Sequence, residues 1–421
     1  MKRLSVFALS AFGAALAATA APSVLVVGVS QDAASGSITV DYTLSGEAAI
    51  VTLDIQTNYT ENAEKKWASV GPANLRNVGG DVNRLVQPGT RKAYWSADMC
   101  WPDGSKAASE VRAVVNAWTK NAPPDWMAIH MLAPYEVSYY THAELVPGGV
   151  TAERYKKEYM LFRKIPAKNV VWTSGFSPSQ AGYSARNQWH KVRLTYDYYM
   201  AVYECTNAQR DGFNNGNLPT ENPMRAVWYS SQASWRGSSD GAKWPTFDGD
   251  DFDFETSRKV DKTSFLGRLR DKTGLMVDLP TEHEWEYACR AGSPGYYYTE
   301  TTRSDVRPTD IEPKIAYTGK GGDSAKPTVV GTLIPNCWGL YDTIGNVQEC
   351  CLDYPGDFAT LYPDQPSTDT VYENPVGAKS GTARVFCGGD ARWSGATVMT
   401  RESRSTNVYE TEGARLCVPL R

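Results

Sequence analysis

The sequence predicts two folded parts: an N-terminal all-β domain over residues 21–120 and a loop-rich α+β domain over residues 169–421. Short β-branched runs separated by turn residues fill the first part. The second part mixes one well-marked helix with long stretches rich in Gly, Pro, Thr and Asp. With 421 residues, 42% of them hydrophobic, the chain is long enough for each part to bury a core. Residues 121–168 are assigned to a connecting segment.

The first part is expected to be a small β-sandwich. Val, Ile, Thr and Tyr dominate its strand-like runs, and Gly, Asn and Ser separate them. The runs are Ser23–Val29, Ile38–Leu44, Ala49–Gln56, 91–96 and 111–118. Several short strands at such spacing favour a sandwich of immunoglobulin or fibronectin-like shape. No catalytic constellation falls within it, so a spacer or adhesion role is expected.

Residues 1–20 have the composition of a cleaved secretory signal peptide. Lys2 and Arg3 precede an apolar run from Leu4 to Ala18, and small residues follow it. This run is too short and too rich in alanine for a membrane span, and no later segment approaches ~20 consecutive apolar residues. We therefore expect export to the periplasm, the cell surface or the medium, without a membrane span. The net charge of −4 gives no basic surface for nucleic acid.

Two consecutive prolines within 121–125 mark the boundary after the first part. Strand-like pieces at 127–132 and 159–163 follow, and the sequence does not decide which neighbour they pair with. Further on, the pattern predicts a strand over 194–203 and a short helix over 227–236.

The clearest helix begins after Thr281. Thr281 and Glu284 form a capping box, and Gly292 is placed to end the helix. Glu282, Glu284 and Glu286 lie on differing faces of this helix. They are expected to form a solvated, capped first turn.

The segment Gly339–Cys351, GLYDTIGNVQECC, gathers oxygen ligands around a glycine turn. Asp342 and Glu349 offer carboxylates, while Gly345 and Val347 lie at a bend where backbone carbonyls can point inward. Calcium accepts six to eight such oxygens. The alternative is a simple turn with solvated acids beside it.

This segment resembles the GLYDxxGNVWEW signature of the formylglycine-generating enzyme family, also called the sulfatase-modifying factor family. Four more stretches fit that family in the same order: 198–207, 223–235, 279–292 and 384–421. The resemblance implies a C-type-lectin-like α+β fold with little regular structure. It also implies a structural Ca²⁺ ion held by Asp342, Gly345, Val347 and Glu349.

The same resemblance bears on catalysis. The enzymes of the family oxidise a substrate cysteine with copper held by two cysteine thiolates, which follow a Gly-Gly-Ser motif. Here the glycines are Gly388 and Gly389, Asp390 stands for the serine, and the two cysteine positions fall on Trp393 and Val398. Neither side chain can bind Cu(I). No catalytic residue is therefore assigned, and copper is not expected.

Eight cysteines in an exported chain permit up to four disulfides. Cys387 and Cys417 are the first pair to consider, because the resemblance places them on neighbouring strands. Cys350 and Cys351 are expected in the core or in separate disulfides. The four histidines include no pair at zinc-ligand spacing, so no zinc or non-haem iron site is expected.

Without the copper thiols, the favoured function is binding of a glycan or protein ligand at the C-terminal loops, residues 390–412. Trp393 can stack on a sugar, and Arg392, Arg401 and Arg404 can engage carboxylate, sulfate or phosphate groups. Three alternatives stay open. The chain is an oxidoreductase that converts a sulfatase cysteine to formylglycine; it is a structural or adhesion protein; or these side chains only pack the loops.

Overall fold

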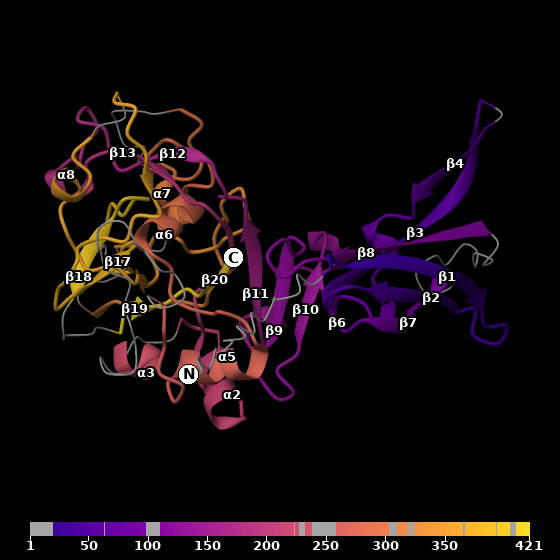
Figure 1. The fold of residues 1–421 in the computed structure, drawn as a ribbon. Coiled ribbons are helices and arrows are strands. Elements are labelled where there is room, and N and C mark those ends of the chain that lie inside the picture. Colours follow the sequence, from indigo (N-terminus) through magenta and orange to yellow (C-terminus); the bar gives the residue numbers. More distant parts are fainter. Residues whose placement is uncertain are drawn as a thin grey trace, which may run out of the picture. The chain divides into compact units, whose positions relative to one another are not determined.

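The computed structural model describes residues 20–421 except 63, 98–109, 223, 227–231, 238–257, 303–309, 317, 320–323, 365–366, 393 and 405–409; for 232, 233 and 404 it describes the backbone alone. The chain divides into two compact units (Figure 1). Unit 1 comprises Met1–Ser69 and Val78–Thr119, and unit 2 comprises Val70–Asn77 and Lys120–Arg421. Among the described residues, no helix has the length and hydropathy needed to cross a bilayer.

Unit 1 contains two antiparallel sheets. The first has the order β1 (Ser23–Gln31), β2 (Ile38–Ser45), β7 (Gly89–Trp95) and β5 (Val78–Gly80). In the second, β3 (Ala49–Glu61) pairs with β4 (Glu64–Ser69), β6 (Arg84–Val86) and β8 (Val111–Trp118). The five strands expected from the sequence of this part are therefore confirmed.

Strand β2 shows why the sequence of unit 1 folds this way. Its alternate residues Ile38, Val40, Tyr42 and Leu44 are buried, while the residues between them are half-buried. Period-2 alternation places the apolar set on one face of the sheet. The face is completed by Trp95 at the end of β7, which is fully buried.

Unit 2 is built on a five-stranded antiparallel sheet. Its order is β10 (Val137–Tyr140), β9 (Trp126–His130), β11 (Tyr159–Ile165), β14 (Asp197–Ala201) and β20 (Cys417–Leu420). Residues 121–168 thus contribute three strands to this sheet. The strand expected over 194–203 is present as β14.

Two smaller sheets lie in the same unit. One has the order β12 (Val171–Ser174), β13 (His190–Arg193) and β16 (Tyr372–Glu373). The other has the order β18 (Arg401–Arg404), β17 (Arg384–Cys387), β15 (Gln348–Cys350) and β19 (Glu412–Gly413). This second sheet carries the C-terminal segment in which binding was expected (Figure 1).

The α-helices of unit 2 are short: α2 (Asn207–Asn215), α3 (Gln232–Arg236), α5 (Phe265–Thr273), α6 (Glu282–Arg290), α7 (Glu312–Ile315) and α8 (Phe358–Leu361). Single 3₁₀ turns are η1 (Pro72–Asn74), η3 (Ala143–Leu145), η4 (Glu153–Lys156) and η5 (Ala185–Asn187). Helix α3 occupies the end of the range predicted as a short helix. The described chain is thus mostly strand and irregular structure with few helices.

Helix α6 confirms the predicted capping box. The Thr281 hydroxyl accepts a hydrogen bond from the Glu284 N–H at 3.2 Å, and the Glu284 carboxylate accepts from the Thr281 N–H at 2.7 Å. The helix ends at Ala291, which adopts a left-handed conformation with φ 46°, and Gly292 follows with φ 89°.

The expectation of a solvated first turn in α6 is wrong. Glu282, Glu284 and Glu286 are all buried, at 2%, 0% and 2% exposure. Each carboxylate has a guanidinium partner: Arg401, Arg258 and Arg290 in that order. Burial without such partners would cost several kcal/mol per charge.

The proposed Cys387–Cys417 pairing is also wrong. Cys387 lies on β17 and Cys417 on β20, which belong to different sheets. The seven described cysteines are all free thiols. Cys350 and Cys351 are buried in the core, and the Cys351 sulfur lies 3.8 Å from that of Cys387.

Candidate functional site

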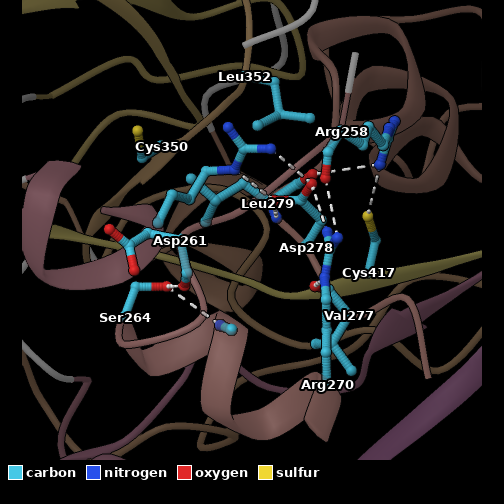
Figure 2. Close-up of polar contacts among 12 residues, drawn as sticks. Arg258, Asp261, Ser264, Arg270, Val277, Asp278, Leu279, Cys350, Leu352 and Cys417 are labelled. Atoms are coloured by element: carbon cyan, nitrogen blue, oxygen red, sulfur yellow. Dashed lines mark hydrogen bonds and ion pairs between the residues drawn. The ribbon is translucent and has the colours of Figure 1, made fainter. Parts of the chain in front are cut away.

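A network of buried ion pairs is centred on Asp278, just before helix α6, and extends to Glu284 within that helix (Figure 2). Arg236 donates to Asp278 from Nε at 2.8 Å and from Nη2 at 3.0 Å, and Arg270 donates to the same carboxylate at 3.0 Å. Arg258 pairs with Glu284 at 2.7 Å. Burial alone raises the pKa of Asp278, but Arg236 and Arg270 outweigh it and hold that pKa below its usual value. The side chains of this network are at most 1% exposed except that of Arg270, which is 13% exposed, so its role is to tie segments of the described chain together.

Glu349, one of the four predicted calcium ligands, is bound by Arg415. The Arg415 Nε lies 3.0 and 2.9 Å from the two carboxylate oxygens, and its Nη2 lies 2.6 Å from one of them. Trp285 donates to the second oxygen from Nε1 at 2.6 Å. Both partners of the ion pair are 1% exposed. The glutamate is therefore neutralised by a guanidinium.

Two further carboxylates lie near this pair. Asp342 is buried and accepts a hydrogen bond from the Gly331 N–H; burial raises the pKa of Asp342 to about 6. Glu204 accepts from the Asn346 side chain and from the Val347 N–H. Burial, then the charges of Asp342 and Glu349, raise the pKa of Glu204 well above its usual value. Glu204 lies in the stretch 198–207 that fits the family, but it was not among the predicted site residues.

As arranged, these groups do not fit a calcium ion. The Glu349 oxygens already accept from Arg415 and Trp285, and one Asp342 oxygen accepts from the Gly331 N–H. Among the residues that the structure describes, no group of three or more His, Cys, Asp or Glu is placed to hold a metal. A calcium ion here would need Glu349 to release Arg415. Bound calcium stays a prediction, and the function proposed below does not depend on it.

The surface of unit 2 is hollowed on both sides of Arg186 and Arg401. The first depression, of about 350 Å³, we call the hydroxyl hollow. Residues 395–401 line one wall of it with Gly395, Thr397, Met399, Thr400 and Arg401; the facing wall includes Phe176, Ser184, Arg186, Asn187 and Tyr296. The second depression, of about 260 Å³, we call the acidic hollow, because Asp357 and Glu402 line it together with the same two arginines.

Arg401, a predicted ligand contact, binds three segments of the chain beneath these hollows. Its guanidinium binds Glu282 with both Nε and Nη2, the latter at 2.6 Å. Its Nη1 donates to the carbonyl of Arg186 and to that of Gly356 at 3.2 Å. The guanidinium lies 4.2 Å above the Phe358 ring. With a side chain only 9% exposed, Arg401 shapes the walls of both hollows, and Glu282 balances its charge.

The other predicted contact residues are placed differently. Arg392 forms an ion pair with Asp390, and its side chain is 7% exposed. Trp393 lies outside the described residues, and of Arg404 only the backbone in β18 is described. Val398, at the second cysteine position, is 1% exposed and packs in the core. The facing wall with Arg186 was missed, because no local motif marks it.

A buried histidine pair lies close to the same region. The Nε2 atoms of His190 and His283 are 3.0 Å apart, and His190 Nδ1 lies 3.0 Å from the Gln188 carbonyl. Burial lowers the pKa of His190 to about 4 and that of His283 well below its usual value. Phe358 and Tyr362 pack against both rings. Both histidines are therefore neutral and belong to the core. His190 and His283 lie too far apart in sequence for a motif to reveal the pair.

Comparison with known proteins assigns the family. Residues 145–415 match the family described as "Sulfatase-modifying factor enzyme 1-like domain". The chain belongs to this family. It is 27% identical to mouse formylglycine-generating enzyme over 254 residues, covering 54% of this chain and 66% of the mouse protein. The enzyme of Streptomyces coelicolor is 36% identical over 116 residues, 26% of this chain and 35% of that protein. The enzyme of Thermomonospora curvata is 31% identical over 204 residues, 46% and 65% of the two chains. The matched regions thus span less than two thirds of the length of each of these three relatives.

Two solved structures resemble the family domain of this chain. Treponema denticola variable protein 1 is 20% identical with a TM-score of 0.42, covering 62% of this chain and 95% of its own. PvdO from Pseudomonas aeruginosa is 18% identical with a TM-score of 0.41, at the same coverages.

Proposed function

We propose that this chain is an exported, non-catalytic, ligand-binding member of the sulfatase-modifying factor family, with a C-type-lectin-like family domain. The observation that supports binding is the hydroxyl hollow itself. Five residues of the segment 395–401 line it, and this is the segment in which the enzymes of the family carry the second copper thiolate. A depression of about 350 Å³ is within the size range of small-ligand sites in proteins.

The residues in the copper positions argue against oxidase chemistry. Val398 is an aliphatic side chain packed in the core, and the sequence gives tryptophan at position 393. Copper(I) needs soft thiolate ligands, which neither side chain supplies. The thiols nearest one another among the described cysteines, Cys351 and Cys387, are fully or almost fully buried, and burial raises the pKa of both.

The lining of the hollow supports a glycan ligand. Thr397 and Thr400 bring hydroxyl groups to one wall, and Ser184 brings another to the facing wall. Phe176 and Tyr296, which are 3% and 1% exposed, add aromatic edges to the lining, and their ring centroids lie 5.1 Å apart. Sugar rings pair hydroxyl groups with apolar C–H faces, so this combination suits them.

An oxidase remains the second candidate, because the curated relatives are formylglycine-generating enzymes. The measurement that separates the two starts with the full chain after copper loading. Metal content by mass spectrometry and oxygen consumption with a cysteine-containing sulfatase peptide give the oxidase arm. Calcium is read in the same elemental analysis. Stoichiometric copper with formylglycine formation would overturn the proposal.

The binding arm uses immobilised glycans and a variant that fills the hollow. Ala181 lines the hydroxyl hollow and is exposed, so Ala181→Trp blocks it without removing a polar group. The matched control is Ala33→Trp, at an exposed position of a turn in unit 1. We expect the parent and the control to retain a glycan that Ala181→Trp does not. Equal retention by all three proteins would refute the assignment to this hollow.

A further inference from the structure

The two hollows differ in charge, and this difference identifies a ligand class. The charged residues that line the hydroxyl hollow are both arginines, Arg186 and Arg401. Glu282 already balances Arg401 from below, through a bidentate ion pair. The acidic hollow, in contrast, brings Asp357 and Glu402 next to the same arginines. No ion pair joins Arg186 to Asp357, to Glu402 or to any other described carboxylate, so the charge left for a ligand in the hydroxyl hollow is that of Arg186.

Resting on the function proposed above, we infer that the hydroxyl hollow takes a sugar ring that bears a carboxylate, with Arg186 as the residue that contacts this carboxylate. Arg186 is exposed, and no hydrogen bond or ion pair joins its guanidinium to another described residue. Among the arginines considered in this region, Arg392 and Arg401 are paired with Asp390 and Glu282. Arg186 thus differs from Arg392 and Arg401 in having its donors available to a ligand.

The backbone around Arg186 is fixed on both sides, so its side chain starts from a defined position. Arg186 lies in the 3₁₀ turn η5, whose capping box joins Ser184 and Asn187. Its carbonyl accepts a hydrogen bond from Arg401. The Phe176 N–H donates to the Asn187 carbonyl at 2.8 Å. Because this backbone is already fixed, ligand binding has to order only the side chain of Arg186.

The neutral groups of the hollow favour a sugar over a free small anion. Thr397 and Thr400 contribute two hydroxyl oxygens 3.4 Å apart, of which one can donate to the other, so one hydroxyl hydrogen remains for a ligand. Phe176, Tyr296 and Met399, which are 3%, 1% and 6% exposed, add small apolar edges to the lining. A planar carboxylate matches the two parallel N–H donors of a guanidinium. A uronate ring satisfies all three kinds of lining group together.

The test measures binding of three soluble trisaccharides to the full chain by titration calorimetry. One is built of galacturonate, the second is its neutral methyl ester, and the third carries sulfate instead of carboxylate. The variant is Arg186→Gln, and the matched control is Lys168→Gln, which also removes one exposed positive charge from unit 2. Because both side chains are exposed, far-UV circular dichroism should be unchanged in both variants.

We expect the parent to bind the galacturonate trisaccharide at least about tenfold more tightly than its methyl ester. Arg186→Gln should abolish that preference and leave the weak binding of the ester unchanged. Lys168→Gln should change the binding of neither sugar. Equal binding of galacturonate by the parent and Arg186→Gln would overturn the inference. So would a preference for the sulfated sugar, which would assign the hollow to sulfate.

Failure of the inference and failure of the proposed function give different results. If Ala181→Trp abolishes binding while Arg186→Gln does not, the hollow binds a sugar but Arg186 does not recognise a carboxylate. If no trisaccharide binds the parent and its glycan retention is unaffected by Ala181→Trp, the hollow is not the binding site and both ideas fall.

Discussion

Asp278→Asn offers a sharp test of the buried ion-pair network in Figure 2. Asp278 is fully buried and accepts three hydrogen bonds from two arginines at 2.8 to 3.0 Å. The amide keeps the shape but removes the charge, so the fully buried Arg236 loses its counter-ion. Removing one partner of a buried pair costs roughly 3–5 kcal/mol. We therefore expect the free energy of unfolding of unit 2 to fall by about that amount.

The assay is equilibrium unfolding of the full chain in urea, followed by hydrogen exchange of peptides from each unit. Peptides of β2 and β3 in unit 1 serve as an internal control and should keep the transition of the parent. The double variant Arg236→Met/Asp278→Asn removes the stranded charge as well. It should be more stable than Asp278→Asn alone, because apolar replacement of a buried pair is often close to neutral.

The pH dependence supplies a second readout of the same residue. Since the folded-state pKa of Asp278 lies below its usual value, its stabilising contribution is fully present above the unfolded pKa of about 3.9. The contribution is lost as pH falls through the folded pKa. The gap between parent and Asp278→Asn should thus close at acidic pH. A loss below about 1 kcal/mol at pH 7, or a double variant no better than the single one, would refute the reasoning.

Two other predictions concern titratable groups of unit 2. Burial, followed by the charge of Glu282, raises the pKa of Asp353 to about 8; its stabilising contribution is fully present below the unfolded pKa of about 3.9 and lost as pH rises through the folded value. Asp353→Asn should therefore flatten the decline in stability between pH 5 and 9 in thermal unfolding, and an unchanged slope would contradict this. Cys337 is exposed, whereas Cys351 and Cys387 are buried with raised pKa values. Iodoacetamide should label Cys337 in the native protein and spare the other two, as peptide mass mapping can check; labelling of Cys351 at the rate of Cys337 would show that the core is open.

The elements that the sequence predicted well are those with local causes. Strand β2 alternates buried and half-buried residues, so its period alone reveals it. The start of helix α6 depends on Thr281 and Glu284, three residues apart. Two of the three strands of the connecting segment, β9 and β11, were also visible, whereas β10 was not predicted. The membership of these strands in the sheet with β14 could not be predicted, because it depends on pairing with residues far along the chain.

The glutamates of α6 show where local reasoning fails. A capping box and acidic residues in a first turn are typical of a solvated helix end, and the sequence was interpreted so. The structure instead buries Glu282 against Arg401, 119 positions away, and Glu284 against Arg258. Arginine partners at such separations leave no periodic signal, so burial of these carboxylates could not be predicted.

For the same reason, only part of the candidate site could be predicted from the sequence. The expected binding face, residues 390–412, includes the segment 395–401 that lines the hydroxyl hollow, and ligand binding there stays a prediction. Its arginines, however, were interpreted by residue type alone, and Arg392 and Arg401 are engaged by Asp390 and Glu282. Arg186, which we propose as the ligand contact, reaches the site through the fold. Nothing in the sequence next to Arg186 distinguishes it from the other arginines of the chain.

The cluster around Glu349 shows the same dependence of charge on the fold. Glu204, Asp342 and Glu349 are all buried, and Arg415 is bound to the last of them. Burial raises the pKa values of Glu204 and Asp342, and the neighbouring carboxylates raise them further. Arg415 acts in the opposite direction on both pKa values, and Lys156 does so on that of Asp342. Protons can restore neutrality at these two groups, and so can a cation that shares them. Oxygen donors in a sequence therefore predict that a positive charge is needed, whereas the fold decides whether an arginine, a proton or a metal ion provides it.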